Sequence, residues 1–254
     1  MSTDAQTVAL DLGIDDFMLV HTSQQRIVPY LDDGVDQWEV VMYTVYDSSP
    51  DTPVGTARIT TIDSYCPDPV AALDELSADL FSVGKALFGE DGELRDDLRE
   101  QMAMPYGRIV IVDEVTIDER LRGQGLGVFL TGMALRHLSD ISGVFALFPG
   151  PLERDDTPYE VAVQQLAQAW SRLGFEHYRD GTWVLDPGTT TLRAALRAGY
   201  ERLARWRWHC CFRLQPGQAE SELVSVTAVH ADTPADQPGP EDPALGNSRV
   251  LRAG

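Results

Sequence analysis

The stretch that decides the fold covers residues 108–135 and reads RIVIVDEVTIDERLRGQGLGVFLTGMAL. Its first part, 108–117, is rich in Val and Ile, which predicts a β-strand. A turn with three glycines follows, and apolar residues at helical spacing then predict a helix over 125–138. A helix that begins on glycines leaves backbone N–H groups unpaired at its positive end. We therefore expect an anion site at this turn, most naturally for a pyrophosphate.

Two other phosphate-binding motifs do not account for the turn. The sequence contains no G-x-x-x-x-G-K-[S/T], which excludes a nucleoside-triphosphate P-loop. Gly123, Gly125 and Gly127 also lack the G-x-G-x-x-G spacing of a dinucleotide-binding turn. The residues alone leave two interpretations open, a ligand site and a turn that serves only the fold.

Periodicity along the rest of the chain predicts a protein with both helices and strands. Further strands are expected where Val, Ile, Thr and aromatic residues gather or alternate, over residues 37–46, 54–62, 144–148, 175–178, 182–185 and 206–212. Helices are expected where apolar residues recur every three or four positions, over 157–173, 189–203 and, with a break at 89–92, over 68–101.

We divide the chain into four parts from these patterns. Residues 1–35 form an N-terminal segment, and 36–187 form the main domain with a helical insertion at about 68–102. A helix and a strand over 188–214 extend this domain. The tail, 215–254, is rich in Ala, Asp, Pro, Gln and Gly and is expected to be disordered, with a possible strand over 222–229.

Charge and cysteine content restrict the partners and the compartment. The chain has 20 Lys+Arg against 40 Asp+Glu and a formal net charge of −20, which disfavours nucleic acid and membrane surfaces as partners. Three cysteines, two of them adjacent, give no disulfide framework. The first ten residues do not resemble a signal peptide, and no apolar stretch approaches a membrane span. We expect a cytoplasmic protein, for which a homodimer is one option.

The glycine turn resembles the signature of the GNAT superfamily of acyl-CoA-dependent N-acetyltransferases, [Gln/Arg]-x-x-Gly-x-[Gly/Ala]. Arg122, Gly125 and Gly127 occupy the three signature positions, and residues 169–175, AWSRLGF, resemble the late helix of the family, which ends in LGF. The resemblance covers about residues 38–186. It implies an α/β (α+β layered) fold with a mixed, splayed central sheet flanked by helices. Acyl-CoA would lie between the parallel strands at 108–117 and 144–148.

The resemblance also implies which residues bind the co-substrate, acetyl-CoA, and it implies no metal. The pantetheine arm would pair with the backbone of Val115, Thr116 and Ile117. Backbone N–H groups of the turn would hold the pyrophosphate; the residues are Arg122, Gly123, Gln124, Gly125, Leu126 and Gly127.

The implied reaction is direct attack of a primary amine on the thioester, the amine being a small cationic molecule or a protein amino group. Glu114 is the favoured general base and Asp113 the alternative, because neighbours on a strand point to opposite faces and only one can serve. A carboxylate that merely pairs at a strand end is the competing interpretation.

The proton donor for the departing thiol is less well defined. Many family members place a tyrosine three residues before the Leu-Gly-Phe, where this chain has Trp170. Tyr159 is the candidate we retain and Tyr178 the second, although packing is the favoured interpretation of each, and solvent could also supply the proton. A non-catalytic acyl-CoA-binding module of the same fold is therefore the alternative function, and an interaction domain without a ligand is a third.

Two clusters are set aside. The sequence His209-Cys210-Cys211 suggests a metal site, but neighbours on a strand face opposite ways and no second Cys/His pair exists. The arginines over 193–213 are interpreted as a solvated helix face, with contact to a nucleotide phosphate or an acidic partner as the alternative.

Overall fold

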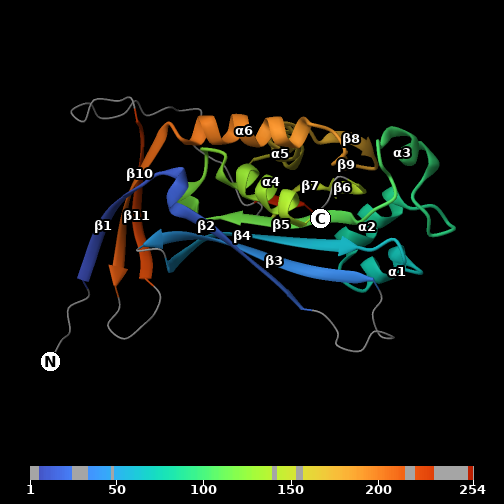
Figure 1. Ribbon diagram of the computed structural model, residues 1–254, viewed down its shortest axis with the longest axis horizontal. Helices are drawn as coiled ribbons and strands as arrows, with labels where there is room; N and C mark the ends of the chain where they lie inside the picture. The colour runs from blue at the N-terminus through green and yellow to red at the C-terminus, as the bar shows by residue number, and fades with distance from the viewer. Residues whose placement is uncertain are drawn as a thin grey trace.

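A computed structural model describes residues 6–24, 34–46, 49–138, 142–152, 157–214, 221–231 and 251–253. Its centre is a mixed sheet with the strand order β2-β3-β4-β5-β6-β9-β8, flanked by helices (Figure 1). The strands are β2 (Phe17–Gln24), β3 (Val35–Tyr46), β4 (Ser49–Ile62), β5 (Ile109–Ile117), β6 (Val144–Leu147), β8 (Glu176–Arg179) and β9 (Thr182–Leu185). The expected mixed α/β architecture is confirmed at this level.

The sheet opens beside β5. β5 and β6 run parallel, and Ile109 to Val112 pair with Val144 to Leu147, whereas the other strand pairs along this path are antiparallel. Beyond Val112, β5 pairs on this edge with β12 (Leu251–Ala253) instead of β6. β12 also pairs with β7 (Pro149–Pro151), which follows β6 along the chain. The space between residues 113–117 of β5 and residues 149–151 of β7 is called the slot below.

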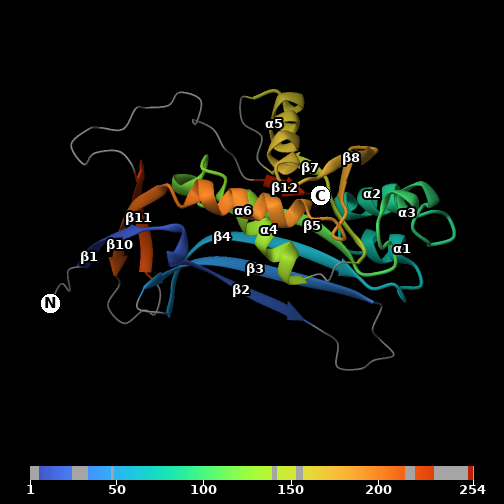
Figure 2. The same ribbon diagram turned by 45° about the horizontal axis from the view of Figure 1, so that its top comes forward.

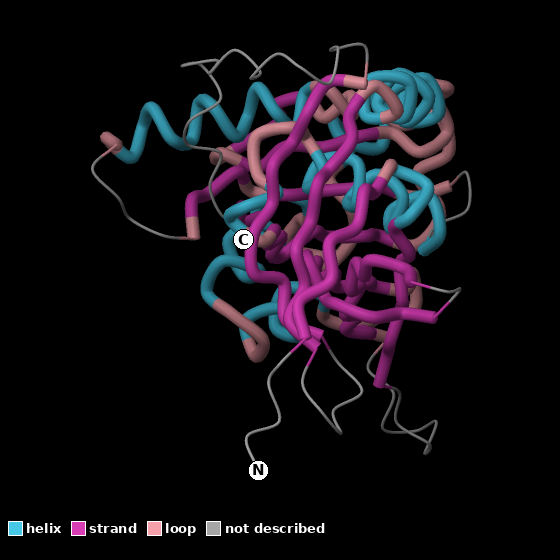
Figure 3. The backbone as a smooth tube through the Cα atoms, turned by 90° about the vertical axis from the view of Figure 1, so that its left-hand side faces the viewer, coloured by secondary structure: helices cyan, strands magenta, loops and turns pink. Residues whose placement is uncertain are grey.

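A second sheet lies at the far end of the molecule from α1, α2 and α3 (Figure 1). It contains β1 (Gln6–Leu12), β10 (Trp206–Leu214) and β11 (Ser221–His230), all antiparallel. Figure 3 faces this end of the molecule. The N-terminal segment is therefore shared between the two sheets, since β1 pairs with β10 while β2 lies in the central sheet.

The tail contains two strands that change its description. β11 confirms the possible strand at 222–229, and Leu223 is buried in the core. β12 was not predicted. The expectation of disorder is therefore wrong for residues 251–253, because β12 pairs its backbone with strands distant in sequence. The remaining tail residues, 215–220, 232–250 and 254, lie outside the described residues.

Helices cover both faces of the sheet (Figures 1 and 2). One face carries α4 (Leu126–Leu138), with α6 (Thr191–Leu203) packed on it and α5 (Tyr159–Ser171) nearby. The other face carries α1 (Pro69–Asp74), α2 (Ala78–Leu87) and α3 (Asp96–Gln101). The stretch at 68–101 thus forms three short helices where two were predicted, and it covers the sheet. Among the described residues, no helix is both long enough and apolar enough to cross a membrane.

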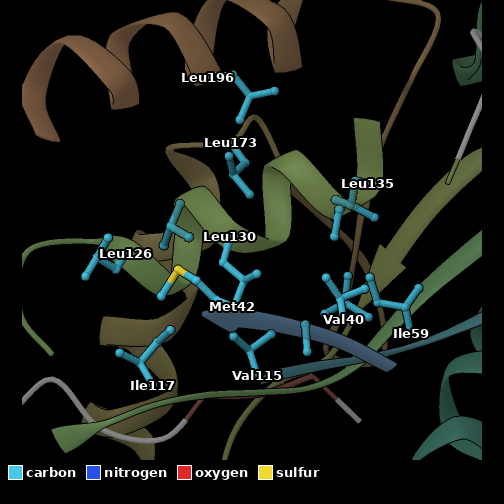
Figure 4. Packing of buried hydrophobic residues seen from close by; sticks show 14 of the residues in the cluster. Val40, Met42, Ile59, Val115, Ile117, Leu126, Leu130, Leu135, Leu173 and Leu196 are labelled. Carbon is cyan, nitrogen blue, oxygen red and sulfur yellow. The ribbon is translucent and has the colours of Figure 1, made fainter. Parts of the chain in front are cut away.

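The core explains why β5 is so apolar. Val110 and Val112 pack with the cluster under α4, while Ile109 and Ile111 pack with the cluster under α2, so neither side faces water. Figure 4 shows the α4 side, where Leu130 and Leu135 lie above the strands and Leu173 and Leu196 lie beyond the helix. This packing fixes the start of α4 relative to the end of β5.

Candidate ligand site at the glycine turn

The chain turns sharply between β5 and α4. A short 3-10 helix, Glu119–Leu121, follows the strand, and the Asp118 side chain caps it by accepting from the Arg120 amide at 3.0 Å. Gly123 and Gly125 have φ angles of 92° and 87°, in the left-handed region that favours glycine. Arg122 stabilises the turn, because its Nε donates to the Ile117 carbonyl at 2.8 Å.

The start of α4 leaves its amides unused. The first backbone bond of the helix runs from the Phe129 amide to the Gly125 carbonyl, at 3.1 Å. In the part of the chain that the structure describes, no amide from Gly123 to Val128 donates a hydrogen bond. These unpaired N–H groups lie at the positive end of a thirteen-residue helix. The turn therefore has the donors that an anion requires.

A cavity opens directly on these amides. The turn residues 122–123 and 125–128 form one wall, Ile117 at the end of β5 and Pro151 of β7 form another, and Ala162, Leu166 and Ala169 of α5 close the third side. The predicted cofactor-binding residues Ile117, Arg122, Gly123, Gly125, Leu126 and Gly127 line this cavity. Gln124 does not line it, and its Oε1 is buried without a partner among the described residues.

Two arginines add positive charge beside the turn. A Cβ placed on Gly125 would lie 2.7 Å from an Nη atom of Arg202, so this guanidinium from α6 lies against the turn. Burial lowers the pKa of Arg202, and the nearby charge of Arg172 lowers it further. Arg172 is exposed at the end of α5 and lines the cavity. Within the described residues, neither guanidinium has an ion pair or a hydrogen bond.

Arg202 is a site residue that the sequence predicted to lie on a solvated helix face. The exposed Arg193 and Arg197 agree with the solvated helix face expected for this region. Arg202 is half-buried and faces inward against Gly125, where it favours the alternative of a phosphate contact. The helical spacing contained a weak signal, because Arg202 follows the buried Gly199 by three positions and so shares its face of α6.

The two candidate base residues share one partner, which corrects the sequence prediction. A β-bulge lies in β5, where Val112 pairs with Ile59 and Glu114 pairs with Arg58, leaving Asp113 as the extra residue. Val110 and Val112 face α4 before the bulge, and Val115 and Ile117 belong to the same cluster after it. Strict alternation is therefore lost at this point.

The expectation that Asp113 and Glu114 point to opposite faces of the strand is therefore wrong, because both carboxylates lie near the Arg58 guanidinium. Nη1 of Arg58 lies 3.3 Å from a Glu114 carboxylate oxygen and 3.7 Å from an Asp113 oxygen. The Asp113 side chain is 6% exposed and that of Glu114 is 24% exposed. Glu114 is the more accessible of the two carboxylates.

The slot offers main-chain groups of β5 and carbonyls of β7. Val115 is fully buried, and the Thr116 hydroxyl is 2.5 Å from that of Thr56 on β4, so the side chains at these positions are committed to the fold. On the β7 side, Pro149 and Pro151 have no N–H, and the Gly150 amide donates to the Phe148 carbonyl at 2.8 Å. β7 therefore presents acceptors only, and whatever lies in the slot must supply donors.

The candidate proton donors lie away from the cavity. Trp170 is fully buried, with its ring edge-on to Phe175. Tyr159 is 53% exposed at the start of α5 and does not line the cavity. The Tyr178 hydroxyl donates to Asp97 at 2.9 Å; burial and then this hydrogen bond raise the pKa of Tyr178 to about 12. The structure thus brings together the turn residues, but not these aromatic residues.

The histidine and cysteine positions show no metal centre. No group of three or more His, Cys, Asp or Glu side chains in the described ranges could hold a metal ion. His209 pairs with Asp11 of β1, and Cys210 is buried whereas Cys211 is partly exposed. Burial is the main cause that raises the pKa of the Cys210 thiol to about 12.

Comparisons with known proteins leave the family open. The chain matches no protein-family model, no curated protein and no solved structure. The function must therefore be argued from the site itself.

Proposed function

We propose that this protein is an N-acetyltransferase that transfers the acetyl group of acetyl-CoA to a primary amine. The observation that carries the proposal is the set of amides at Gly123 to Val128, with the guanidinium of Arg202 beside them, none of which has a partner within the described residues. A diphosphate carries negative charge and many acceptor oxygens, and these match the unused amides and the two arginines beside the cavity. The resemblance of the turn to the GNAT signature supports the same ligand.

The slot suits the pantetheine arm, which is the part of acetyl-CoA beyond the diphosphate. From a diphosphate at the turn, the pantetheine arm would follow β5 from Ile117 towards Val115 and pair with the edge of β5 that faces the slot. The arm carries two amide N–H groups, and β7 presents only carbonyl acceptors at Pro149 to Pro151. The donors of the arm thus match the acceptors of the wall.

The proposed reaction uses the Glu114 carboxylate and the backbone N–H groups of residues 115–117, which lie beside the slot. The amine nitrogen attacks the thioester carbon, the carbon–sulfur bond breaks, and the CoA thiolate leaves and takes a proton from water. Glu114 accepts the proton that the amine loses, directly or through a water molecule. A backbone N–H within Val115 to Ile117 stabilises the oxyanion of the tetrahedral intermediate.

The substrate class is a primary amine, either a small cationic molecule or a protein amino group. The net charge of −20 attracts cations to the surface in general, and Asp113 and Glu114 place two carboxylates next to the slot. Arg58 neutralises part of this charge, so an incoming ammonium group competes with Arg58 for Glu114.

A second candidate function is an acyl-CoA-binding module without turnover. Two observations favour it. Trp170 stands where many members of the resembled family have the tyrosine that protonates the thiol. The Tyr178 hydroxyl donates to Asp97 of α3, which lies on the face of the sheet opposite α4. In such a module the turn would bind the ligand and Glu114 would serve only the ion pair with Arg58.

Release of free CoA thiol with a panel of polyamines, aminoglycosides and lysine peptides separates the two functions. We expect turnover with at least one amine, and Glu114→Gln should lower kcat about 100-fold with unchanged affinity for acetyl-CoA. Arg58→Gln is the matched control, because it removes the same ion pair and keeps the carboxylate. Acetyl-CoA binding without turnover on any amine would favour the module, and a wild-type pH profile for Glu114→Gln would transfer the role to Asp113 or water.

A further inference from the structure

The slot already contains a segment of this chain. β12 lies antiparallel to both walls: Leu251 and Arg252 pair with Val115 and Glu114 of β5, and Leu251 to Ala253 pair with Pro151 to Pro149 of β7 (Figure 2). These positions include Val115, along which the pantetheine arm is expected to run. Two occupants cannot use the same main-chain edge at once.

β7 depends on this occupant. Its three residues, Pro149 to Pro151, pair with β12 and with no other strand of the described chain. Because β7 offers no free N–H group, its carbonyls need donors from outside, and an extended peptide backbone supplies them. The slot is therefore a site for an extended segment with regularly spaced N–H groups.

The cavity at the glycine turn stays open while β12 is in place. The residues that line it include Ile117 and Pro151, which lie at the mouth of the slot, whereas β12 pairs with Val115 and Glu114 of β5 and not with the amides of the turn. Anion site and slot are thus neighbours with separate occupants. A ligand that needs only the turn can bind beside β12, whereas a ligand that extends into the slot must displace it.

We propose that the slot between β5 and β7 is a binding site for an extended peptide, and that β12 occupies it as an autoinhibitory strand. β12 blocks the pantetheine arm of acyl-CoA and leaves the diphosphate site accessible. This inference rests on the proposed function, because it assigns the displaced ligand as acyl-CoA. The inhibition is competitive, and it acts through main-chain pairing at Val115 and Glu114.

Calorimetric titration of four proteins with CoA and with ADP tests the inference. ADP carries a diphosphate and no pantetheine arm. The proteins are the full chain, a chain that ends at Val250, a triple variant Leu251→Pro, Arg252→Pro and Ala253→Pro, and a control with Leu251→Ala and Arg252→Ala. The proline variant keeps the length and removes the main-chain donors of β12, while the control keeps them. Far-UV circular dichroism checks that each protein is folded.

We expect the shortened chain and the proline variant to bind CoA about tenfold more tightly than the full chain and the control. This is the change if the slot is free in about one molecule in ten. The affinity for ADP should be the same in all four proteins, because β12 pairs with β5 and β7 and not with the amides at Gly123 to Val128.

The titrations distinguish failure of the autoinhibitory strand from failure of the proposed function. Equal CoA affinity in all four proteins would overturn the autoinhibitory strand and leave acyl-CoA binding intact. An equal gain in ADP affinity would also overturn it, because β12 would then change the anion site as well as the slot. If the shortened chain bound no CoA, the proposed function would fall, and the role of β12 with it.

Discussion

Two loops of this protein combine a glycine in the left-handed region with a nearby arginine, yet they are built differently. In the cover formed by α1 to α3, Gly92 has a φ of 78°, and Arg95 donates to the carbonyls of Ala86 and Lys85 at 3.1 and 3.0 Å. At the start of α4, Gly125 has a φ of 87°, and Arg202 lies against it. Within the described residues, the guanidinium of Arg202 has no such partner.

The difference shows which loop serves the fold and which serves a ligand. A protein usually pairs its half-buried charges, because a desolvated cation without a partner destabilises the folded state. The cover follows this rule. The turn departs from this rule, because its amides are unused and its two arginines repel each other. A bound anion would accept from the amides and would offset the repulsion between the arginines.

The largest expected effect on CoA affinity comes from a methyl group at Gly125, and a methyl group at Gly92 is the control. Gly125→Ala places a Cβ 2.7 Å from the Arg202 guanidinium, which must then move away from the amides, so CoA affinity should fall about 10- to 100-fold. Gly92→Ala has a similar φ and a nearest contact at 3.6 Å, so it should keep wild-type CoA affinity and share only the backbone strain. Equal losses of CoA affinity in the two variants would remove the distinction between the loops.

Removal of the arginines should separate affinity from stability. Arg202→Ala should weaken CoA binding about tenfold, since it deletes one charge-assisted contact. Arg95→Ala should leave CoA binding unchanged and lower the free energy of unfolding by about 1–2 kcal/mol, because two carbonyls lose their donor. Calorimetry and urea unfolding measure the two quantities. Greater destabilisation by Arg202→Ala than by Arg95→Ala would make Arg202 a structural residue.

The smallest effect is expected at Tyr178, where the cover contacts β8. Tyr178→Phe should lower stability by about 1 kcal/mol through loss of the hydrogen bond to Asp97, with turnover unchanged. Because the pKa of Tyr178 is raised to about 12, its stabilising contribution is complete below about pH 10 and is lost as the pH rises towards 12. Urea unfolding at pH 8 and 11 measures this. A strong loss of turnover in Tyr178→Phe would restore the tyrosine as a proton donor.

Local patterns predicted the elements that form the site, and non-local pairing decided the rest. The Val/Ile run and the three glycines were sufficient for β5, the turn and α4, because periodicity and glycine content are local signals. The bulge at Asp113 leaves no such signal, and it alone overturned the expectation for the two carboxylates. Arg202 and β12 reach the site from distant parts of the chain, through α6 and through pairing with β5.

In the proposed function, the amides at the start of α4 bind the diphosphate of acyl-CoA. A crystal structure of the chain that ends at Val250, grown with CoA, tests it most directly. We predict diphosphate oxygens within hydrogen-bonding distance of amides from Gly123 to Val128 and of the Arg202 guanidinium, with the pantetheine arm beside Val115. A diphosphate bound elsewhere, with these amides left unpaired, would contradict the account.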